Sequence, residues 1–256
     1  MTMLYSFYAA EGIVYAADSR ITHEGGTQPL KSQRKVLRLP GFGPSDGVIG
    51  FFGLAQVKGQ PMAEWLSSVI AKYPAARDAD TFARHLAGRI ESEATAEELK
   101  QVSGFHIGTF ERRGGHPVPT FTFLRNAADM KDGYYIKIGK FLPPEEQLLG
   151  RDLRGIPMAA IRQTLRLRQA QAGTPHWYRN GDVVHFGTIG SLLELALQNL
   201  VQQPGLSFRA PQSLAEWNRV ARTLVASTGN LYRSYYSGAV PPVGGRVDVE
   251  AIAWPK

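Results

Sequence analysis

MTMLYSFYAAEGIVYAADSR, the sequence of residues 1–20, predicts a β-hairpin at the start of the chain. Leu4–Tyr8 and Ile13–Ala17 are rich in aromatic and β-branched residues, as strands are. Ala9–Gly12 reads as the turn between them, because Gly12 is free to adopt a positive φ. These residues therefore predict two antiparallel neighbouring strands.

A threonine and an aspartate stand at the open end of this hairpin. A hairpin of this length brings its ends together, so we expect Asp18 to lie beside Thr2. Removal of Met1, which methionine aminopeptidase performs before a small residue, would give Thr2 a free α-amine. The hydroxyl could then attack while that amine, with an ordinary pKa of about 7.7–8.0, takes its proton. A Met-Thr start without any catalytic role and a turn aspartate at a strand end are the alternatives.

A lysine enters the next strand-like stretch, SQRKVLRL, residues 32–39. If this strand pairs beside the hairpin, Lys35 reaches the same place as Thr2 and Asp18. Its ammonium would favour the alkoxide that develops on Thr2, and Asp18 would keep it charged and oriented. A solvated basic edge strand is the alternative. Taken together, the three residues favour a hydrolytic site.

Residues 2–20, with GIVYAADSR (residues 12–20) at their centre, resemble the opening of proteasome β-type subunits and their bacterial homologues. Those proteins are N-terminal-nucleophile (Ntn) hydrolases. The resemblance places the family's nucleophile at Thr2, its aspartate at Asp18 and its lysine at Lys35. It implies an α+β fold, a four-layer αββα sandwich of two antiparallel sheets, usually assembled into rings.

The stretch GVIGFFGLA, residues 47–55, is an apolar strand that ends in glycine before a predicted helix. The resemblance implies that a glycine here gives its backbone N–H to the oxyanion, and we assign this to Gly53 in preference to Gly50. Glycine suits the role because the backbone must come close to the substrate. A glycine that only interrupts a buried strand is the alternative.

The resemblance also implies an auxiliary serine that helps the N-terminal amine. The nearest candidate is Ser191, which stands in FGTIGSLLEL, residues 186–195. A serine at this place is also an ordinary helix N-cap. The family's second aspartate, near the C-terminal glycines, has no counterpart at a matching position; Ser237 and Asp248 are the nearest residues.

The remaining pattern fits one domain spanning residues 1–256. Apolar periodicity predicts helices over residues 61–73, 79–90, 157–171, 191–202 and 213–230, and strands over 105–110, 120–124, 134–139 and within 243–252. Asp80 is the expected N-cap of the second helix. The basic segment around residues 141–182 is expected to be an insertion.

Composition limits the function further. The 256 residues are 43% hydrophobic, enough for a substantial core, and hold no apolar run long enough to span a membrane. A net charge of +7 suggests the hypothesis of nucleic-acid binding. No recognition motif supports that hypothesis, so a nucleic-acid partner is not expected. The absence of cysteine excludes thiolate chemistry and fits a cytoplasmic protein. The six histidines lack metal-ligand spacing, so neither metal nor cofactor is expected.

The sequence thus predicts a threonine-type Ntn peptidase acting on peptides or unfolded proteins. We expect a homo-oligomer, in keeping with the ring that the resemblance implies, and an ATPase partner is compatible with it. Two alternatives stay open: an Ntn amidohydrolase of small amides, and a catalytically silent subunit that serves structure or partner binding.

Overall fold

The structure is a computed structural model of the whole chain. It describes residues 2–21, 32–73, 78–113, 116–126, 139–141, 163, 176–181, 191–193, 195–197, 199–200, 203, 205, 209–235 and 243–255.

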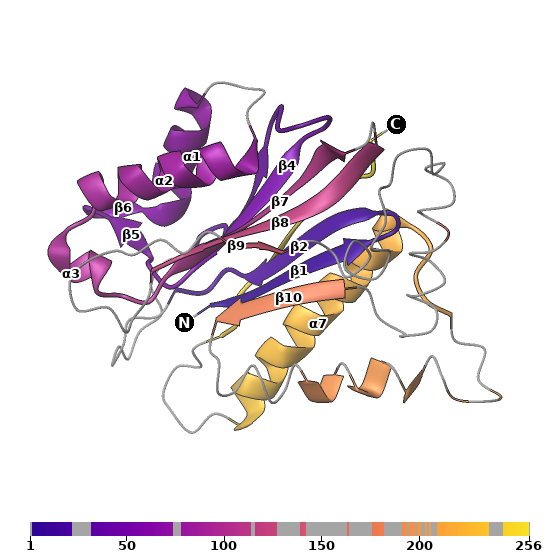
Figure 1. Cartoon of the computed structure of the whole chain (residues 1–256). Coiled ribbons are helices and arrows are strands. Elements are labelled where there is room, and N and C mark those ends of the chain that lie inside the picture. The colour runs from indigo at the N-terminus through magenta and orange to yellow at the C-terminus, as the bar shows by residue number, and fades with distance from the viewer. Residues whose placement is uncertain are drawn as a thin grey trace.

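Two antiparallel sheets lie face to face at the centre of the molecule (Figure 1). The first sheet has the order β10 (His176–Gly181), β1 (Met3–Ala9), β2 (Gly12–Asp18), β11 (Val247–Ala253). The second has the order β3 (Val36–Leu39), β4 (Gly47–Phe52), β7 (Gly104–Arg113), β8 (His116–Arg125), β9 (Gly139–Phe141). A small ribbon of β5 (Gln56–Val57) and β6 (Gln60–Pro61) precedes the first helix.

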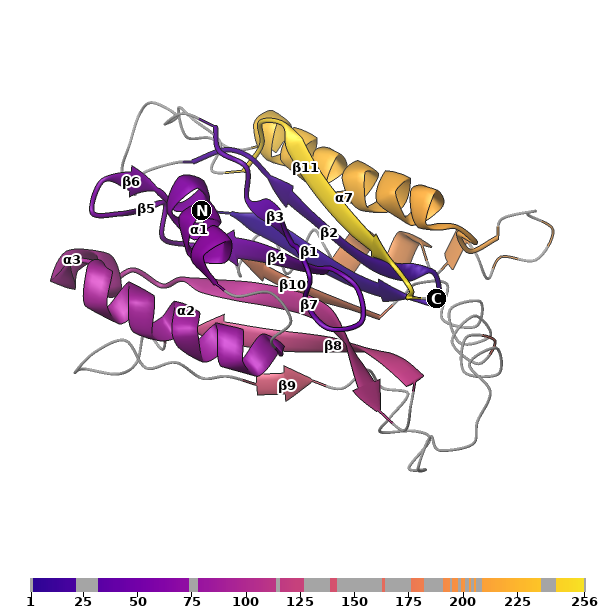
Figure 2. The ribbon, with the colours of Figure 1, turned by 90° about the horizontal axis from the view of Figure 1, so that it is seen from above.

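Helices cover the outer faces of both sheets, as the view from above shows (Figure 2). The second sheet carries α1 (Met62–Lys72) and α2 (Ala79–Glu93), followed by the short α3 (Ala96–Leu99). The first sheet carries α7 (Leu214–Tyr235). The predicted α+β sandwich of two antiparallel sheets between helical layers is therefore confirmed. In the described part of the chain, no helix is both long and apolar enough to cross a membrane.

Three apolar clusters fill the three spaces between these four layers. Alternation along β1 assigns its side chains: Met3, Tyr5 and Phe7 pack toward α7, while Leu4 and Tyr8 lie between the sheets. Both faces of the strand are thus buried, which explains why residues 3–9 are almost all apolar. The buried strand fixes the position of Thr2, which directly precedes it.

The predicted hairpin is present, with a tight turn at Ala10 and Glu11. Gly12 follows at φ 150°, and a Cβ there would lie 2.2 Å from the carbonyl oxygen of Ile252. Glycine is needed because β11 passes so close to the turn. The hairpin register pairs Leu4 with Ala17, which places the beginning of β1 opposite the end of β2.

The strand after Lys35 differs from expectation in its partner. β3 does not pair beside the hairpin; it forms an edge of the second sheet. The place next to β2 is taken by β11, from the far end of the chain. The chain around Lys35 therefore approaches Asp18 from the opposite sheet rather than from a neighbouring strand.

One helix cap differs from expectation, and one end of the expected insertion forms a strand. Asp78, not Asp80, caps α2: its carboxylate accepts the backbone N–H of Thr81 at 2.8 Å. The end of the 141–182 segment forms β10, which pairs with β1, so residues 176–181 belong to the sheet. The predicted strand over 134–138 and nearly all of the predicted helix over 157–171 lie outside the described residues.

Candidate active site

Asp18 lies at the end of β2 and is almost fully buried. Its Oδ1 accepts the backbone N–H of Met3 at 2.7 Å, and its Oδ2 accepts the N–H of Gly244 at 3.1 Å. Hydrogen bonds from backbone N–H groups compensate a carboxylate for the loss of water. Asp18 therefore holds the peptide group between Thr2 and Met3 in a fixed place.

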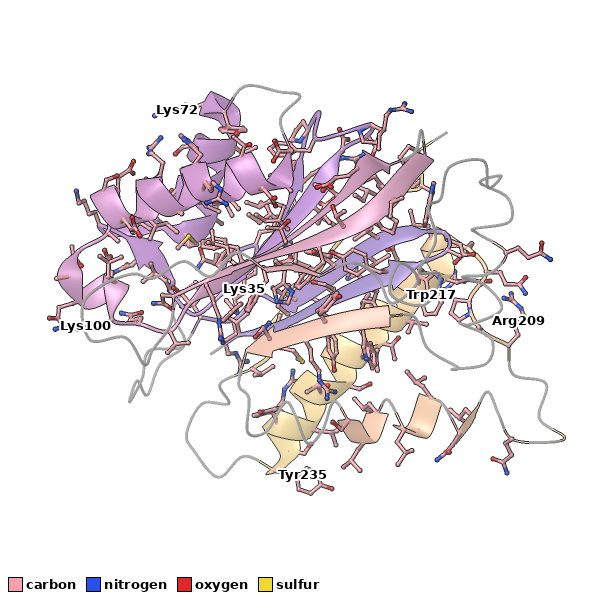
Figure 3. All side chains as sticks on the ribbon, in the orientation of Figure 1. Lys35, Lys72, Lys100, Arg209, Trp217 and Tyr235 are labelled. Carbon is pink, nitrogen blue, oxygen red and sulfur yellow. The ribbon has the colours of Figure 1, made fainter. Side chains whose placement is uncertain are left out.

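Lys35 contributes a buried cation to the same carboxylate. Its Nζ lies 3.3 Å from Asp18 Oδ1 and also donates to the backbone carbonyl of Arg20. The side chain sits in the middle of the molecule, whereas Lys72 and Lys100 lie at the periphery (Figure 3). Burial lowers the pKa of the Lys35 ammonium from its ordinary value, and the charges of Asp18 and Asp248 oppose that shift.

Thr2 stands directly before β1 and is 5% exposed. Met3 N–H and Lys35 Nζ share one oxygen of Asp18, so the three residues singled out in the sequence come together at the open end of the hairpin. The residue that carries the hydroxyl, the buried ammonium and the carboxylate paired with it are thus neighbours. Their catalytic roles remain predictions.

Gly53 follows the end of β4, near Lys35. The N–H of Phe51 donates to the Lys35 carbonyl at 3.1 Å, and Gly53 comes two residues later at φ 84°. A Cβ at Gly53 would lie 2.0 Å from the carbonyl oxygen of Val102, so this close approach requires glycine. Gly50 is placed differently, since a Cβ there would meet the side chain of Leu4 in the core between the sheets.

Ser191 lies beside the first sheet. Arg179, on β10 opposite Tyr5, donates from Nη2 to Ser191 Oγ at 2.8 Å. This contact connects Ser191 to the strand next to β1. Its auxiliary role remains a prediction.

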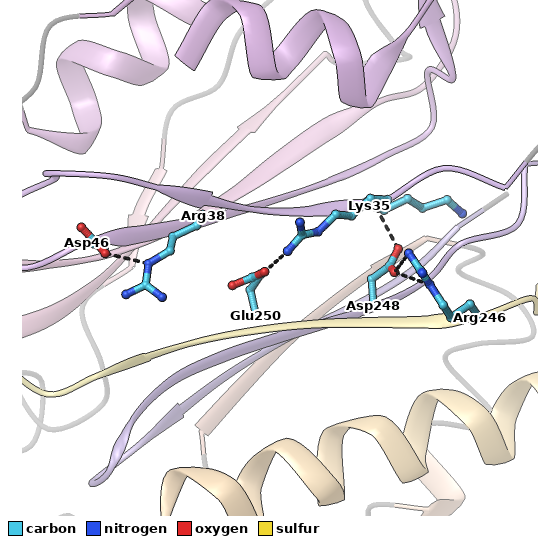
Figure 4. Close-up of polar contacts among 7 residues, drawn as sticks. Lys35, Arg38, Asp46, Arg246, Asp248 and Glu250 are labelled. Atoms are coloured by element: carbon cyan, nitrogen blue, oxygen red, sulfur yellow. Dashed lines mark hydrogen bonds and ion pairs between the residues drawn. The ribbon is translucent and has the colours of Figure 1, made fainter. Parts of the chain in front are cut away.

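The sequence did not assign a role to the C-terminal segment, which lies against this site. Ser19 N–H donates to the Arg246 carbonyl at 2.8 Å, and Lys35 N–H donates to Asp248 Oδ2 at 3.3 Å. Figure 4 shows Asp248 between Lys35 and Arg246. The available signal was an aspartate in a strand of mainly apolar residues, three residues after the pair Gly244 and Gly245.

A second polar cluster lies between the sheets, around His106 of β7. Asn180 Nδ2 is a donor 2.7 Å from His106 Nε2, so Nε2 accepts and Nδ1 carries the hydrogen toward Ser6 Oγ, also at 2.7 Å. Burial lowers the pKa of His106 to about 3, which keeps the ring neutral. Tyr8 and Tyr15 join hydroxyls at 2.7 Å nearby. This cluster ties β1, β7 and β10 together.

The arrangement around Asp18 can support acyl transfer at Thr2. The buried ammonium of Lys35 lies beside Thr2, which carries the hydroxyl. The exposed backbone of Gly53 lies at the end of strand β4. Among the described residues, no group of three or more His, Asp or Glu side chains is placed to hold a metal ion.

Among comparisons with known proteins, only the one with solved structures finds similar chains. No protein-family model matches this chain, and no curated protein matches it. The chain is similar to the Anbu Gly-1 mutant from Hyphomicrobium sp. strain MC1, at 13% identity and TM-score 0.48 over 99% of this chain and 82% of that one.

Two further solved structures show the same degree of likeness. They are Thiobacillus denitrificans BPH in complex with epoxomicin, at 12% identity and TM-score 0.48 over 99% of both chains, and HslV from Trypanosoma brucei, at 13% identity and TM-score 0.43 over 98% of this chain and 99% of that one. The likeness to proteasome-type proteins thus spans the whole chain. At TM-scores below 0.5 it carries no argument about activity, and the fold rests on the strands and helices themselves.

Proposed function

We propose that this chain is a threonine-type Ntn hydrolase that cleaves peptide bonds through an acyl-enzyme on Thr2 once Met1 has been removed. One observation supports this most directly. A single oxygen of the buried Asp18 carboxylate joins the amide next to Thr2 to the ammonium of Lys35. A pair of buried charges is costly to maintain, and its place beside a hydroxyl gives it a chemical use.

In the first half of the proposed reaction, the α-amine of Thr2 takes the hydroxyl proton and Oγ attacks the carbonyl carbon of the scissile bond. The oxyanion that forms accepts a hydrogen bond from the Gly53 N–H. The protonated α-amine of Thr2 then gives its proton to the departing amine of the substrate as the C–N bond breaks. An ester between the substrate acyl group and Thr2 Oγ remains.

In the second half, water replaces the departed amine. The α-amine takes a proton from the water, which attacks the ester carbonyl. Collapse of the second oxyanion breaks the bond to Thr2 Oγ and releases the carboxylic acid, and the α-ammonium gives its proton to Oγ, which restores the hydroxyl. Each half-reaction thus uses the same base and the same oxyanion donor.

Lys35 and Asp18 set the electrostatics of the attack. The ammonium stabilises negative charge as it develops on Thr2 Oγ, and this effect is large in a site from which water is excluded. Asp18 holds the ammonium in place through the 3.3 Å contact. The pKa of Lys35, lowered by burial, makes its charge more sensitive to pH than that of an exposed lysine.

Peptides or unfolded polypeptides are the proposed substrates, and a homo-oligomer is the proposed assembly. The test compares wild type with Thr2→Ala and Thr2→Ser on fluorogenic peptides and on small amides, and the intact mass of each chain shows whether Met1 is retained. All three chains keep a small second residue and so permit Met1 removal. We expect Thr2→Ala to be inactive, because it has no hydroxyl, and Thr2→Ser to retain activity.

The outcomes separate the alternatives. Hydrolysis that survives in Thr2→Ala contradicts the proposal. Cleavage of small amides but not of peptides, lost in Thr2→Ala, identifies an amidohydrolase instead. Inactivity of all three chains, with Met1 retained on each, identifies a silent subunit.

A further inference from the structure

We infer that Asp248 is a positioning residue for Lys35, and that the C-terminal segment 243–248 completes the active site. This inference rests on the proposed function, because it concerns how that site is held. It assigns a role to residues more than two hundred positions from Thr2.

The C-terminal segment contacts both sides of the Asp18–Lys35 pair. Gly244 donates its N–H to Asp18 at 3.1 Å and accepts the N–H of Arg20 with its carbonyl, also at 3.1 Å. Arg20 in turn presents its own carbonyl to Lys35 Nζ. The segment therefore fixes the carboxylate and the carbonyl that receive the ammonium.

Asp248 holds the backbone of Lys35 itself. It is 6% exposed, and its Oδ2 accepts the Lys35 N–H at 3.3 Å across the boundary between the two sheets (Figure 4). Its Oδ1 pairs with Arg246 Nη2 at 3.0 Å. The Asp248 carboxylate is held by Arg246 on one side and accepts the Lys35 N–H on the other, so it gives the Lys35 backbone a defined position.

A second charged pair nearby helps to distinguish the specific contact between Asp248 and Lys35 from a general attraction between the two sheets. On the same strand, Glu250 pairs with Arg34, which precedes Lys35 in the chain. Glu250 therefore also joins β11 to the chain near Lys35, but through an Arg34 side chain that is about half exposed. Glu250 contributes to attachment and does not touch Lys35, which makes it the matched control.

The charge of Asp248 acts on Lys35 together with the groups around it. Asp18 from β2 and Asp248 from β11 favour the ammonium, while Arg20 opposes it and Arg246 partly neutralises Asp248. Loss of the Asp248 charge should therefore lower the pKa of Lys35 further. A residue that only supports the fold would not change that pKa selectively.

The experiment compares wild type with Asp248→Asn, Asp248→Ala, Asp248→Glu and Glu250→Gln in the full chain. The first readout is the ionisation of Lys35, followed by NMR of lysine labelled with carbon-13 at Cε; the signal is assigned by its loss in Lys35→Arg. The second readout is kcat/KM for a cleaved peptide as a function of pH. Thermal unfolding of each variant shows whether it is folded.

We expect Asp248→Asn to lower the ionisation midpoint of Lys35, because its amide oxygen can still accept the N–H but carries no charge. Asp248→Ala removes both and should reduce kcat/KM by about tenfold or more, the equivalent of one hydrogen bond to a charged group. Glu250→Gln should leave both readouts near wild type. Asp248→Glu should recover part of the loss.

The two proposals fail differently. An unchanged Lys35 midpoint in folded Asp248→Asn, or an equal shift in Glu250→Gln, overturns the role of Asp248 whatever the activity. A wild-type chain without hydrolysis, with a Lys35 midpoint that does shift in Asp248→Asn, overturns the proposed function and leaves the positioning contact in place.

Discussion

At the scale of single residues, the described part of the chain buries ionisable groups in two different ways. Asp18 and Lys35 are buried as an ion pair next to Thr2, and His106 is buried as a neutral ring between the sheets. A buried ion pair depends on both partners being present. A buried neutral histidine depends on pH.

Removal of one partner of the Asp18–Lys35 pair should be costly. We expect Asp18→Ala to lower the free energy of unfolding by about 3–5 kcal/mol, because it leaves the Lys35 ammonium buried without its carboxylate. The control is Asp46→Ala, which removes the partner of the half-exposed Arg38 and should cost about 1 kcal/mol or less. Urea unfolding at pH 7 measures both, and equal losses would contradict the assignment.

His106 should make the fold sensitive to acid. Its pKa of about 3 lies below the ordinary 6.5, so the unfolded chain binds a proton more readily than the folded one. The stabilisation from the neutral ring is therefore complete above pH 6.5 and declines as pH falls toward 3, by up to about 1.4 kcal/mol per pH unit.

Urea unfolding of wild type and His106→Gln between pH 7 and pH 4 tests this dependence. We expect the wild-type free energy of unfolding to fall more steeply with acid than that of the variant, which cannot titrate at this position. Parallel curves would show that His106 is not held neutral by the fold.

At the scale of elements, the local sequence pattern was enough to predict strand pairing where a strand and its partner are close in sequence. The hairpin of β1 and β2 was predicted from its own residues because a two-residue turn fixes its register. The partner of β3 was not, because β11, from the far end of the chain, occupies the edge of β2. The cap of α2 was missed by two residues, since Asp78 and Asp80 both suit a helix N-terminus.

Gly53 allows a test of one short junction, between β4 and the β5–β6 ribbon. Gly53→Ala should reduce peptide hydrolysis by about a hundredfold, as for loss of one oxyanion donor, because the added Cβ meets the Val102 carbonyl and the backbone must shift. Gly59→Ala is the control: Gly59 also has a positive φ, but nothing lies within 4 Å of an added Cβ. Kinetics of both purified variants measure the effect, and similar losses would argue against an oxyanion role.

At the scale of the whole molecule, the site is assembled from both ends of the chain and both sheets. Thr2 and Asp18 come from the first hairpin, Lys35 from the entry to the second sheet, and Asp248 from the last strand. Spacing in the sequence indicated the first three because each lies near the N-terminus. It did not indicate that Asp248 contacts Lys35, because the two residues come together only after the two sheets have packed.

The most direct test of the central claim is the intact mass of the purified chain before and after treatment with the peptide epoxyketone epoxomicin. Such a probe can react with a hydroxyl and an amine on the same residue, and it adds its full mass without a leaving group. We predict a chain that lacks Met1, gains the mass of one probe, carries it on Thr2 by peptide mapping, and gains nothing in Thr2→Ala. A chain that keeps Met1 and gains no mass would contradict the account and leave the Asp18–Lys35 pair as a feature of the fold alone.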